Sequence, residues 1–145
     1  MNYANKKYLI LGVSKSGRSA IEFLIKHGAE CYFYEELKGS KIDTAISEIT
    51  EMGAKRVVDV NDEVLSKIDI CVISPGVPIN HKIAVFMKNA GKRIIGEFEL
   101  GYQVLIPQFV AVTGTNGKTT TVTIIDEILK KANIRVLLLE ISVAL

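Results

Sequence analysis

The residues best suited to chemistry stand in one glycine-rich run, "TGTNGKTT". Gly114 and Gly117 allow successive backbone N–H groups to turn inward as an anion-binding nest. Lys118 can then reach the β- and γ-phosphate oxygens, and the hydroxyl of Thr119 can ligate Mg²⁺. The phosphate-binding pattern G-x-x-x-x-G-K-[ST] is met in its second half only, because Val112 stands where the first glycine is expected.

An apolar stretch precedes this run and a helical stretch follows it, which is the context that a phosphate-binding loop requires. The alternative interpretation is a plain glycine turn that carries an exposed lysine. The pattern favours a nucleoside triphosphate site, with Lys118 beside the phosphates. The candidate residues of this site are Gly114, Thr115, Asn116, Gly117, Lys118, Thr119 and Thr120, and the family resemblance described below implies that they bind ATP, with Lys118 as the catalytic residue.

A second glycine-bearing turn, "GVSKSG", follows the first apolar run of the chain. It resembles the dinucleotide fingerprint G-x-G-x-x-G, except that Ser14 replaces the middle glycine. A helix that begins here offers free N–H groups and a partial positive charge to an anion. The turn therefore predicts a phosphate or diphosphate site, and the alternative is a tight turn that binds nothing. The predicted site residues are Gly12, Val13, Ser14, Lys15, Ser16 and Gly17.

Two adjacent carboxylates, Glu35 and Glu36, end the second apolar run. Dinucleotide-binding folds keep a ribose-binding acid at this point, although two solvated loop charges are an equally good interpretation. A later apolar run ends in "SPGVP", a loop that two prolines and a glycine constrain. Ser74, Pro75 and Gly76 of this loop are further candidates for contact with a bound ligand.

Short β-rich runs alternate with helical stretches, which predicts a Rossmann-like, doubly wound, mostly parallel α/β sheet. Such a sheet brings the two turns and the two glutamates to one edge. The stretch after Pro107 predicts the start of a second, phosphate-loop α/β domain. The expected strands span 7–13, 30–35, 54–60, 68–74, 92–97, 108–114 and 134–145, and the expected helices span 17–28, 41–53, 81–91, 98–105 and 118–133.

Composition excludes several classes of protein. The net charge of +2 is too small to indicate a nucleic-acid or membrane surface. No apolar run approaches 18 residues, so we expect no membrane span, and the N-terminus lacks the features of a signal peptide. Cys31 and Cys71 lie in apolar runs and are expected to be reduced core residues. The chain is therefore expected to be cytoplasmic.

Four segments together resemble the Mur ligase family and its folylpolyglutamate synthetase relatives. They are "ILGVSKSGRSA", "ISPGVP", "IIGEFELGY" and "TGTNGKTTT". Within that family the combination is similar to the MurD-type, D-glutamate-adding ligases of peptidoglycan synthesis. The resemblance extends from Lys7 to about Asn133 without a break.

The resemblance implies a UDP-substrate-binding domain over residues 1–105 and the start of a central ATP-binding domain over 106–145. It implies an ATP- and Mg²⁺-dependent ligase that joins D-glutamate to UDP-N-acetylmuramoyl-L-alanine through an acyl phosphate. The UDP-substrate would face the Gly12–Gly17 turn, Glu35, Glu36 and the Ser74–Gly76 loop. Thr119 and Glu140 would hold the metal. The full-length protein is expected to be monomeric, with no nucleic-acid or membrane partner.

The chain departs from the family at two points. Glu35-Glu36-Leu37 stands where the family's uracil-side turn usually reads Asp-Thr-Arg, and the family's Gly-Asn segment after the ATP-loop helix, predicted here over 118–133, is missing. We therefore expect a truncated ligase chain that is inactive alone, with D-glutamate binding left to absent domains. Two alternatives are a nicotinamide- or nucleotide-binding Rossmann module with a redox or regulatory role, and a scaffold without a ligand.

Overall fold

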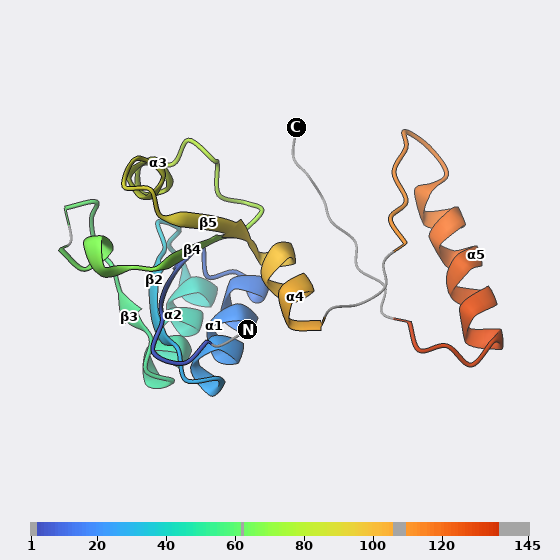
Figure 1. Cartoon of the computed structure of the whole chain (residues 1–145), viewed down its shortest axis with the longest axis horizontal. Coiled ribbons are helices and arrows are strands. Elements are labelled where there is room, and N and C mark those ends of the chain that lie inside the picture. The colour runs from blue at the N-terminus through green and yellow to red at the C-terminus, as the bar shows by residue number, and fades with distance from the viewer. Residues whose placement is uncertain (1–2, 62, 106–109, 137–145) are drawn as a thin grey trace. The chain divides into compact units, whose positions relative to one another are not determined.

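The computed structural model describes residues 3–61, 63–105 and 110–136. The chain divides into two compact units, Met1–Ile106 and Pro107–Leu145 (Figure 1). Each unit is described by itself below.

Unit 1 is built on a five-stranded sheet in which every pairing is parallel, in the order β3-β2-β1-β4-β5. This order places β1 in the centre and leaves the carboxyl ends of all five strands at one edge. The predicted doubly wound, mostly parallel sheet is confirmed. The strands are β1 (Lys7–Leu11), β2 (Glu30–Tyr34), β3 (Lys55–Arg56), β4 (Ile70–Ile73) and β5 (Arg93–Gly96).

Helices cover both faces of this sheet, with α1 and α2 on one side and α3 on the other (Figure 1). Residues of α4 share the α1 side, and a 3₁₀ helix, η1, shares the α3 side. The chain thus crosses from one face to the other between β3 and β4. The bounds are α1 (Lys15–Lys26), α2 (Ser40–Glu51), η1 (Glu63–Lys67), α3 (Lys82–Asn89) and α4 (Glu97–Leu105).

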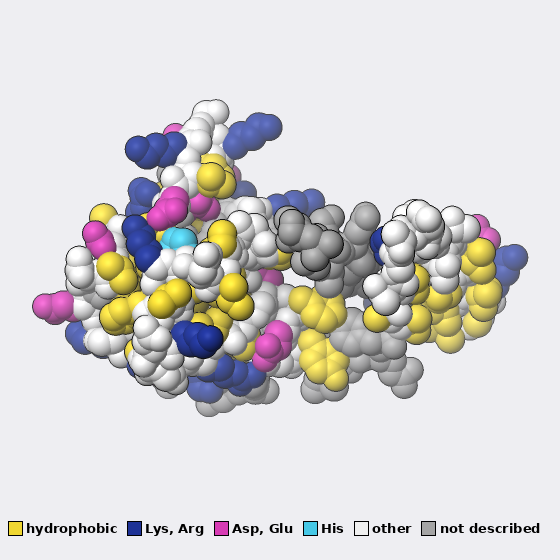
Figure 2. All heavy atoms as spheres, turned by 90° about the horizontal axis from the view of Figure 1, so that it is seen from above, with side chains coloured by type: hydrophobic (Ala, Val, Ile, Leu, Met, Phe, Trp, Pro, Cys, Tyr) yellow, Lys and Arg dark blue, Asp and Glu magenta, His cyan; other side chains and the backbone are white. Residues whose placement is uncertain are grey.

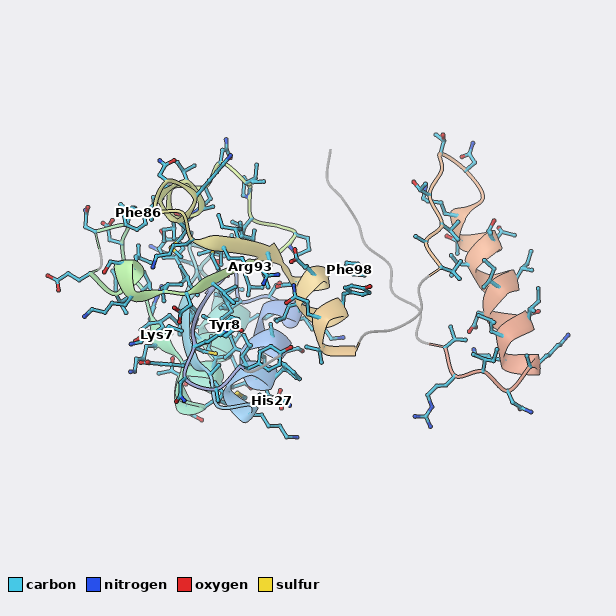
Figure 3. The ribbon with its side chains drawn as sticks, viewed as in Figure 1. Lys7, Tyr8, His27, Phe86, Arg93 and Phe98 are labelled. Carbon is cyan, nitrogen blue, oxygen red and sulfur yellow. The ribbon has the colours of Figure 1, made fainter. Side chains whose placement is uncertain are left out.

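Strand periodicity divides the core into two clusters. Tyr8 and Ile10 of β1 pack on the α1 side, whereas Leu9 and Leu11 pack on the α3 side, and all four are at most 1% exposed. Successive side chains of a strand point to opposite faces, so a strand covered on both faces must be apolar throughout. This explains the continuous apolar runs in the sequence. Tyr8 lies at the centre of unit 1 in Figure 3.

Several element boundaries differ from the predicted ones. The first strand ends at Leu11 rather than at residue 13, because Gly12 adopts a φ of 90°. The strand predicted over 54–60 is reduced to two residues, and the next part of that segment exposes 78% of Val58 to solvent. The helix predicted to begin at Gly17 already begins at Lys15.

In unit 2 the structure describes one helix, α5 (Lys118–Lys131), where a helix was predicted. The strand predicted over 108–114 is not formed in its described part, 110–114, and residues 134–136 of the last predicted strand are not extended in a sheet either. A strand needs a hydrogen-bonding partner, and no described residue of unit 2 supplies one. The rest of these two predictions lies outside the described residues.

Hydrophobic side chains gather along one side of unit 2 in Figure 2. Ile124 and Ile128 of α5 are 54% and 60% exposed. The buried residue that the structure describes on α5 is Asp126, which accepts a hydrogen bond from Lys130 at 2.7 Å. This unit therefore buries little apolar surface among its described residues.

The two cysteines are free and buried in separate clusters on opposite faces of the sheet. Burial raises the pKa of both Cys31 and Cys71 to about 12. Thiols with such a pKa are protonated near neutrality and are poor nucleophiles. In the described part of the chain, no helix has the length and apolar character needed to cross a membrane.

Candidate nucleotide-binding site

The turn between β1 and α1 is fixed by bonds to both neighbouring strands. The N–H of Gly12 donates to the carbonyl of Tyr34 at 3.0 Å. The Ser74 hydroxyl lies 3.1 Å from the carbonyl oxygen of Gly12. A Cβ on Gly12 would come within 3.1 Å of Ser74, and its φ of 90° also favours glycine. The predicted turn residues therefore lie at the centre of the carboxyl edge of the sheet.

Helix α1 presents free donors at this edge. Its N-cap, Ser14, forms no side-chain capping bond. Within the described residues, no acceptor meets the backbone N–H groups of Ser14, Lys15, Ser16 or Gly17. These are the unsatisfied N–H groups of a helix N-terminus, where the helix dipole also favours negative charge.

Gly17 allows α1 to approach β1 closely. A Cβ on Gly17 would lie only 2.1 Å from the carbonyl oxygen of Gly12, so a side chain does not fit there. This is the third glycine of the fingerprint, whose role is close packing of helix and strand. The exposed Lys15 adds the only formal positive charge of the turn, "GVSKSG". The arrangement can bind an anion such as a phosphate.

The two adjacent glutamates point in opposite directions. Glu35 is 9% exposed, and its Oε2 accepts a hydrogen bond from the Val13 N–H at 2.9 Å. Its Oε1 accepts from the Leu37 N–H at 2.7 Å. The Glu36 side chain, by contrast, is 56% exposed.

Polar side chains from the end of β2 and the start of α3 lie around Glu36. The Tyr34 hydroxyl donates to its Oε1 at 2.6 Å, and the His81 Nε2 and Lys82 Nζ each lie 3.5 Å from the same oxygen. The bond from Tyr34, followed by the contacts of His81 and Lys82, lowers the pKa of Glu36. His81 also caps α3, because its Nδ1 accepts from the Ile83 N–H at 3.3 Å. That bond leaves Nε2 as the protonated nitrogen of neutral His81, facing Glu36.

The loop after β4 and the start of α4 meet beside the turn. Ser74 is 3% exposed, and its hydroxyl contacts Glu97 Oε1 as well as Gly12. A hydroxyl has one proton, so it can donate to either oxygen. Pro75 and Gly76 continue the loop, and both are exposed. Of the predicted loop residues, Ser74 is thus the one that contacts the turn.

A groove of about 680 Å³ runs from the N-terminus of α1 along α4. Helix α4 is held to β5 by Arg93, whose guanidinium donates to Glu99 at 3.0 Å (Figure 3). The groove's lining residues from 14 to 19 are polar, whereas most of the others are apolar. It is lined by Ser14, Lys15, Ser16, Ser19, Ala20, Phe23, Glu97, Leu100, Gly101 and Val104.

The glycine-rich run of unit 2 forms an exposed loop that leads into α5. Gly117 is the N-cap of α5 with a φ of 78°, and Gly114 has a φ of 150°. The Lys118 ammonium folds back onto this loop, where it donates to the carbonyl of Gly114 and lies 3.4 Å from that of Thr115. The side chain of Thr119 is exposed at the start of the helix. A helix N-terminus, left-handed glycines and a nearby ammonium group suit a phosphate.

The predicted metal ligands are only partly described. Glu140 lies outside the described residues. Among the described ones, no group of three or more His, Cys, Asp or Glu side chains is arranged to hold a metal ion. Mg²⁺ bound with a nucleotide takes few protein ligands and several from phosphates and water. Thr119 is therefore the one described candidate for its protein ligand.

Sequence reasoning missed four side chains around these turns, namely Tyr34, His81, Lys82 and Glu97. Each is a polar residue at the end of a strand or the start of a helix on the carboxyl edge. The signal for His81 was available, because a histidine directly before a helical stretch can act as an N-cap. The contacts with Glu36 depend on strand order, which the sequence does not state.

Fold and site together define unit 1 as a Rossmann-like domain with an anion-binding turn at its central strand. Among solved structures, the protein AtPrR2 in its apo form is similar, with a TM-score of 0.51 and 17% sequence identity. The match covers 90% of this chain and 46% of that chain. Identity this low supports the fold alone.

Residues 6–96 match the family described as "Mur ligase MurD-like, N-terminal domain", and the chain belongs to that family. The predicted MurD-type resemblance is confirmed. The UDP-N-acetylmuramoylalanine–D-glutamate ligase of Caldicellulosiruptor saccharolyticus is 40% identical over 134 residues, which are 90% of this chain and 30% of the relative. The ligase of the same name from Lachnospira eligens is 39% identical, over 92% of this chain and 30% of its own length. The chain thus spans about 30% of the length of these relatives.

Proposed function

We propose that unit 1 is the UDP-substrate-binding domain of an ATP-dependent ligase that joins D-glutamate to UDP-N-acetylmuramoyl-L-alanine. The observation that carries this proposal is the N-terminus of α1. Four backbone N–H groups that meet no acceptor among the described residues lie there, beside Lys15, on a turn that both neighbouring strands hold. Membership in the MurD-like family and the names of the relatives supply the class of substrate.

In this proposal the diphosphate of the substrate binds the N–H groups of residues 14–17, with Lys15 and the hydroxyls of Ser14 and Ser16 as further donors. Glu36 and the polar side chains around it lie near the nucleoside of the substrate, and the Ser74–Gly76 loop faces the sugar. A parallel sheet binds ligands outside the carboxyl ends of its strands, at the point where the strand order reverses. Here that point lies between β1 and β4.

Unit 2 would supply the ATP loop of the same ligase, Gly114–Thr120. The substrate carboxylate attacks the γ-phosphorus of ATP, ADP leaves, and an acyl phosphate forms. The amine of D-glutamate then attacks the acyl carbon, and phosphate leaves. Lys118 would stabilise charge on the transferring phosphoryl group. Mg²⁺, held by Thr119 and Glu140, would neutralise charge on the same phosphates. Such a ligase acts in the cytoplasm, where ATP and nucleotide-linked sugars are present.

Calorimetric titration of UDP into the whole chain tests the diphosphate site. We expect Lys15→Ala to weaken UDP binding by roughly 1–2 kcal/mol, because one charge-assisted bond to phosphate is lost. Lys26→Ala is the matched control, since it removes the same charge from the exposed, opposite end of α1.

Titrations with NADH and ATP complete this experiment. Tight binding of NADH with no binding of UDP would favour a dinucleotide-binding module instead. Equal affinity of Lys15→Ala and the parent for UDP would show that the β1–α1 turn is not the phosphate site.

A further inference from the structure

The side chains of Glu35 and Glu36 are chemically identical neighbours, yet they occupy different environments. Sequence reasoning assigned both to the substrate. Glu36 is more than half exposed and lies among the polar side chains of two elements. Glu35 is nine-tenths buried, and its carboxylate faces the β1–α1 turn. The two residues therefore have different roles at the same edge of the sheet.

Both oxygens of Glu35 are engaged by backbone donors. Oε2 accepts from Val13 at 2.9 Å and Oε1 accepts from Leu37 at 2.7 Å. Hydrogen bonds to an ionised carboxylate are roughly twice as strong as neutral ones. Val13 is 1% exposed, so its N–H has no access to water and would be left unsatisfied without Glu35. Turning the carboxylate outward would cost this buried bond.

The bond to Val13 acts on the residue just before the free N–H groups. Gly12 is already fixed on both sides, through its N–H to Tyr34 and its carbonyl to Ser74. Val13 is the next residue, and the chain then enters α1, where the N–H groups of residues 14–17 have no partner in the described part of the chain. Fixing the Val13 N–H therefore sets the direction in which those donors point.

We propose that Glu35 is a positioning residue, which holds the Val13 N–H and thereby orients the anion-binding N-terminus of α1, and that it makes no contact with the nucleoside. This inference rests on the proposed function, because it concerns the same diphosphate site. In this proposal Glu36 and its neighbours recognise the nucleoside, whereas Glu35 preorganises the β1–α1 turn.

The variant Glu35→Gln tests this role with little change in side-chain volume. A glutamine has one carbonyl oxygen and one NH₂ group, so it can accept from either Val13 or Leu37 but not from both. Two probes separate positioning from contact, namely UDP and its 2′,3′-dideoxyribose analogue, which keeps the diphosphate but lacks the ribose hydroxyls. Both are titrated by calorimetry into the whole chain.

We expect Glu35→Gln to weaken both ligands by the same factor, about five- to tenfold, as the loss of one charge-assisted bond implies. We also expect faster hydrogen exchange of the Val13 amide. Glu36→Gln is the matched control for exchange, since it makes the same change at the next residue and should leave the Val13 amide protected. A loss confined to UDP, with the dideoxy analogue unaffected, would mean that Glu35 contacts the ribose and would overturn the proposal.

Because a glutamine can still accept from Val13, the exchange measurement is repeated with Glu35→Met, which places no hydrogen-bond acceptor of comparable strength there. Unchanged exchange at Val13 in Glu35→Met would overturn the proposal as well. If the parent chain binds neither ligand, the proposed function fails, and the exchange comparison still decides whether Glu35 holds the turn. Should Glu35→Gln not fold, Glu35→Asp replaces it. This variant keeps both acceptors on a side chain one methylene shorter, and we expect a smaller increase in exchange and a smaller loss of affinity, again equal for the two ligands.

Discussion

At the scale of single residues, a cluster of charged and polar side chains around Glu30 lies away from the proposed site. Glu30 begins β2 and accepts from Lys55 at 2.7 Å and from the Tyr32 hydroxyl at 2.6 Å, and Lys7 lies 3.0 Å from its other oxygen. These contacts, the one with Lys55 first, lower the pKa of Glu30 to about 2. A shifted pKa often marks a functional site. This one lies at the amino edge of a parallel sheet, opposite the ligand-binding edge, so its role is to join the starts of three strands.

The Glu30 cluster predicts a specific dependence of stability on pH. The folded-state pKa of about 2 lies below the ordinary value near 4.5, so ionised Glu30 stabilises the fold fully above about pH 4.5. That contribution is lost as pH falls from 4.5 through 2. The side chain is 35% exposed, so we expect Glu30→Gln to cost about 0.5–1 kcal/mol at pH 7.

Urea unfolding of the parent and Glu30→Gln at pH 7 and pH 3 measures this effect, with the exposed Glu22→Gln as control. The difference in free energy of unfolding between parent and Glu30→Gln should shrink at pH 3. A difference that stays constant across this range would show that the charge of Glu30 contributes nothing.

At the scale of elements, the sequence predicts strands and helices well where one pattern dominates. The run around Tyr8 and Leu9 is apolar on both faces, and β1 is indeed covered on both faces. Prediction fails at ends of elements, because those depend on contacts between distant residues. Gly12 leaves the strand to bond with Tyr34 and Ser74, and neither partner is near it in sequence.

The candidate site likewise has parts that the sequence predicts and parts that it does not. The turns themselves were predictable from glycine spacing, since Gly12 and Gly17 have the local roles that the fingerprint implies. The opposite orientations of Glu35 and Glu36 were not, because they follow from the position of Val13 and of the start of α3 beside β2. Likewise, the strand predicted before the loop of unit 2 needs a neighbouring strand, which sequence patterns over residues 108–114 do not supply.

The contact between α1 and β1 predicts that Gly17→Ala destabilises unit 1. The added Cβ would lie 2.1 Å from the Gly12 carbonyl oxygen, so the helix must move away from the strand. We expect a loss of about 2–3 kcal/mol in the free energy of unfolding. Gly101→Ala is the control, because nothing lies within 4 Å of a Cβ at this position in α4.

Gly101→Ala should be neutral or stabilise the protein by up to about 1 kcal/mol, since alanine is the better helix former. Chemical unfolding of both variants measures the contrast. Equal stability of Gly17→Ala and the parent would mean that α1 can shift without cost, and the turn would then be less rigid than its hydrogen bonds indicate.

At the scale of the whole molecule, the two units differ in how much of a nucleotide site each provides. Unit 1 joins its turn to a buried sheet through Glu35 and Ser74, both of which are nine-tenths or more buried. In unit 2 every residue from Thr113 to Thr121 is exposed. A site exposed to water stabilises transferring charge weakly, because solvent screens its donors. The chain also spans about 30% of the length of its ligase relatives.

We therefore expect binding without turnover. The chain should bind UDP through unit 1 but release no phosphate from ATP in the presence of UDP-N-acetylmuramoyl-L-alanine and D-glutamate. Lys118 alone cannot replace the groups that a phosphoryl-transfer site holds together, since their effects on rate depend on acting as a unit. A coupled phosphate assay on the purified chain measures this, with Lys118→Ala as the control for contaminating ATPase. D-glutamate-dependent phosphate release that Lys118→Ala abolishes would contradict the expectation, because it would mean that these residues complete the ATP site by themselves.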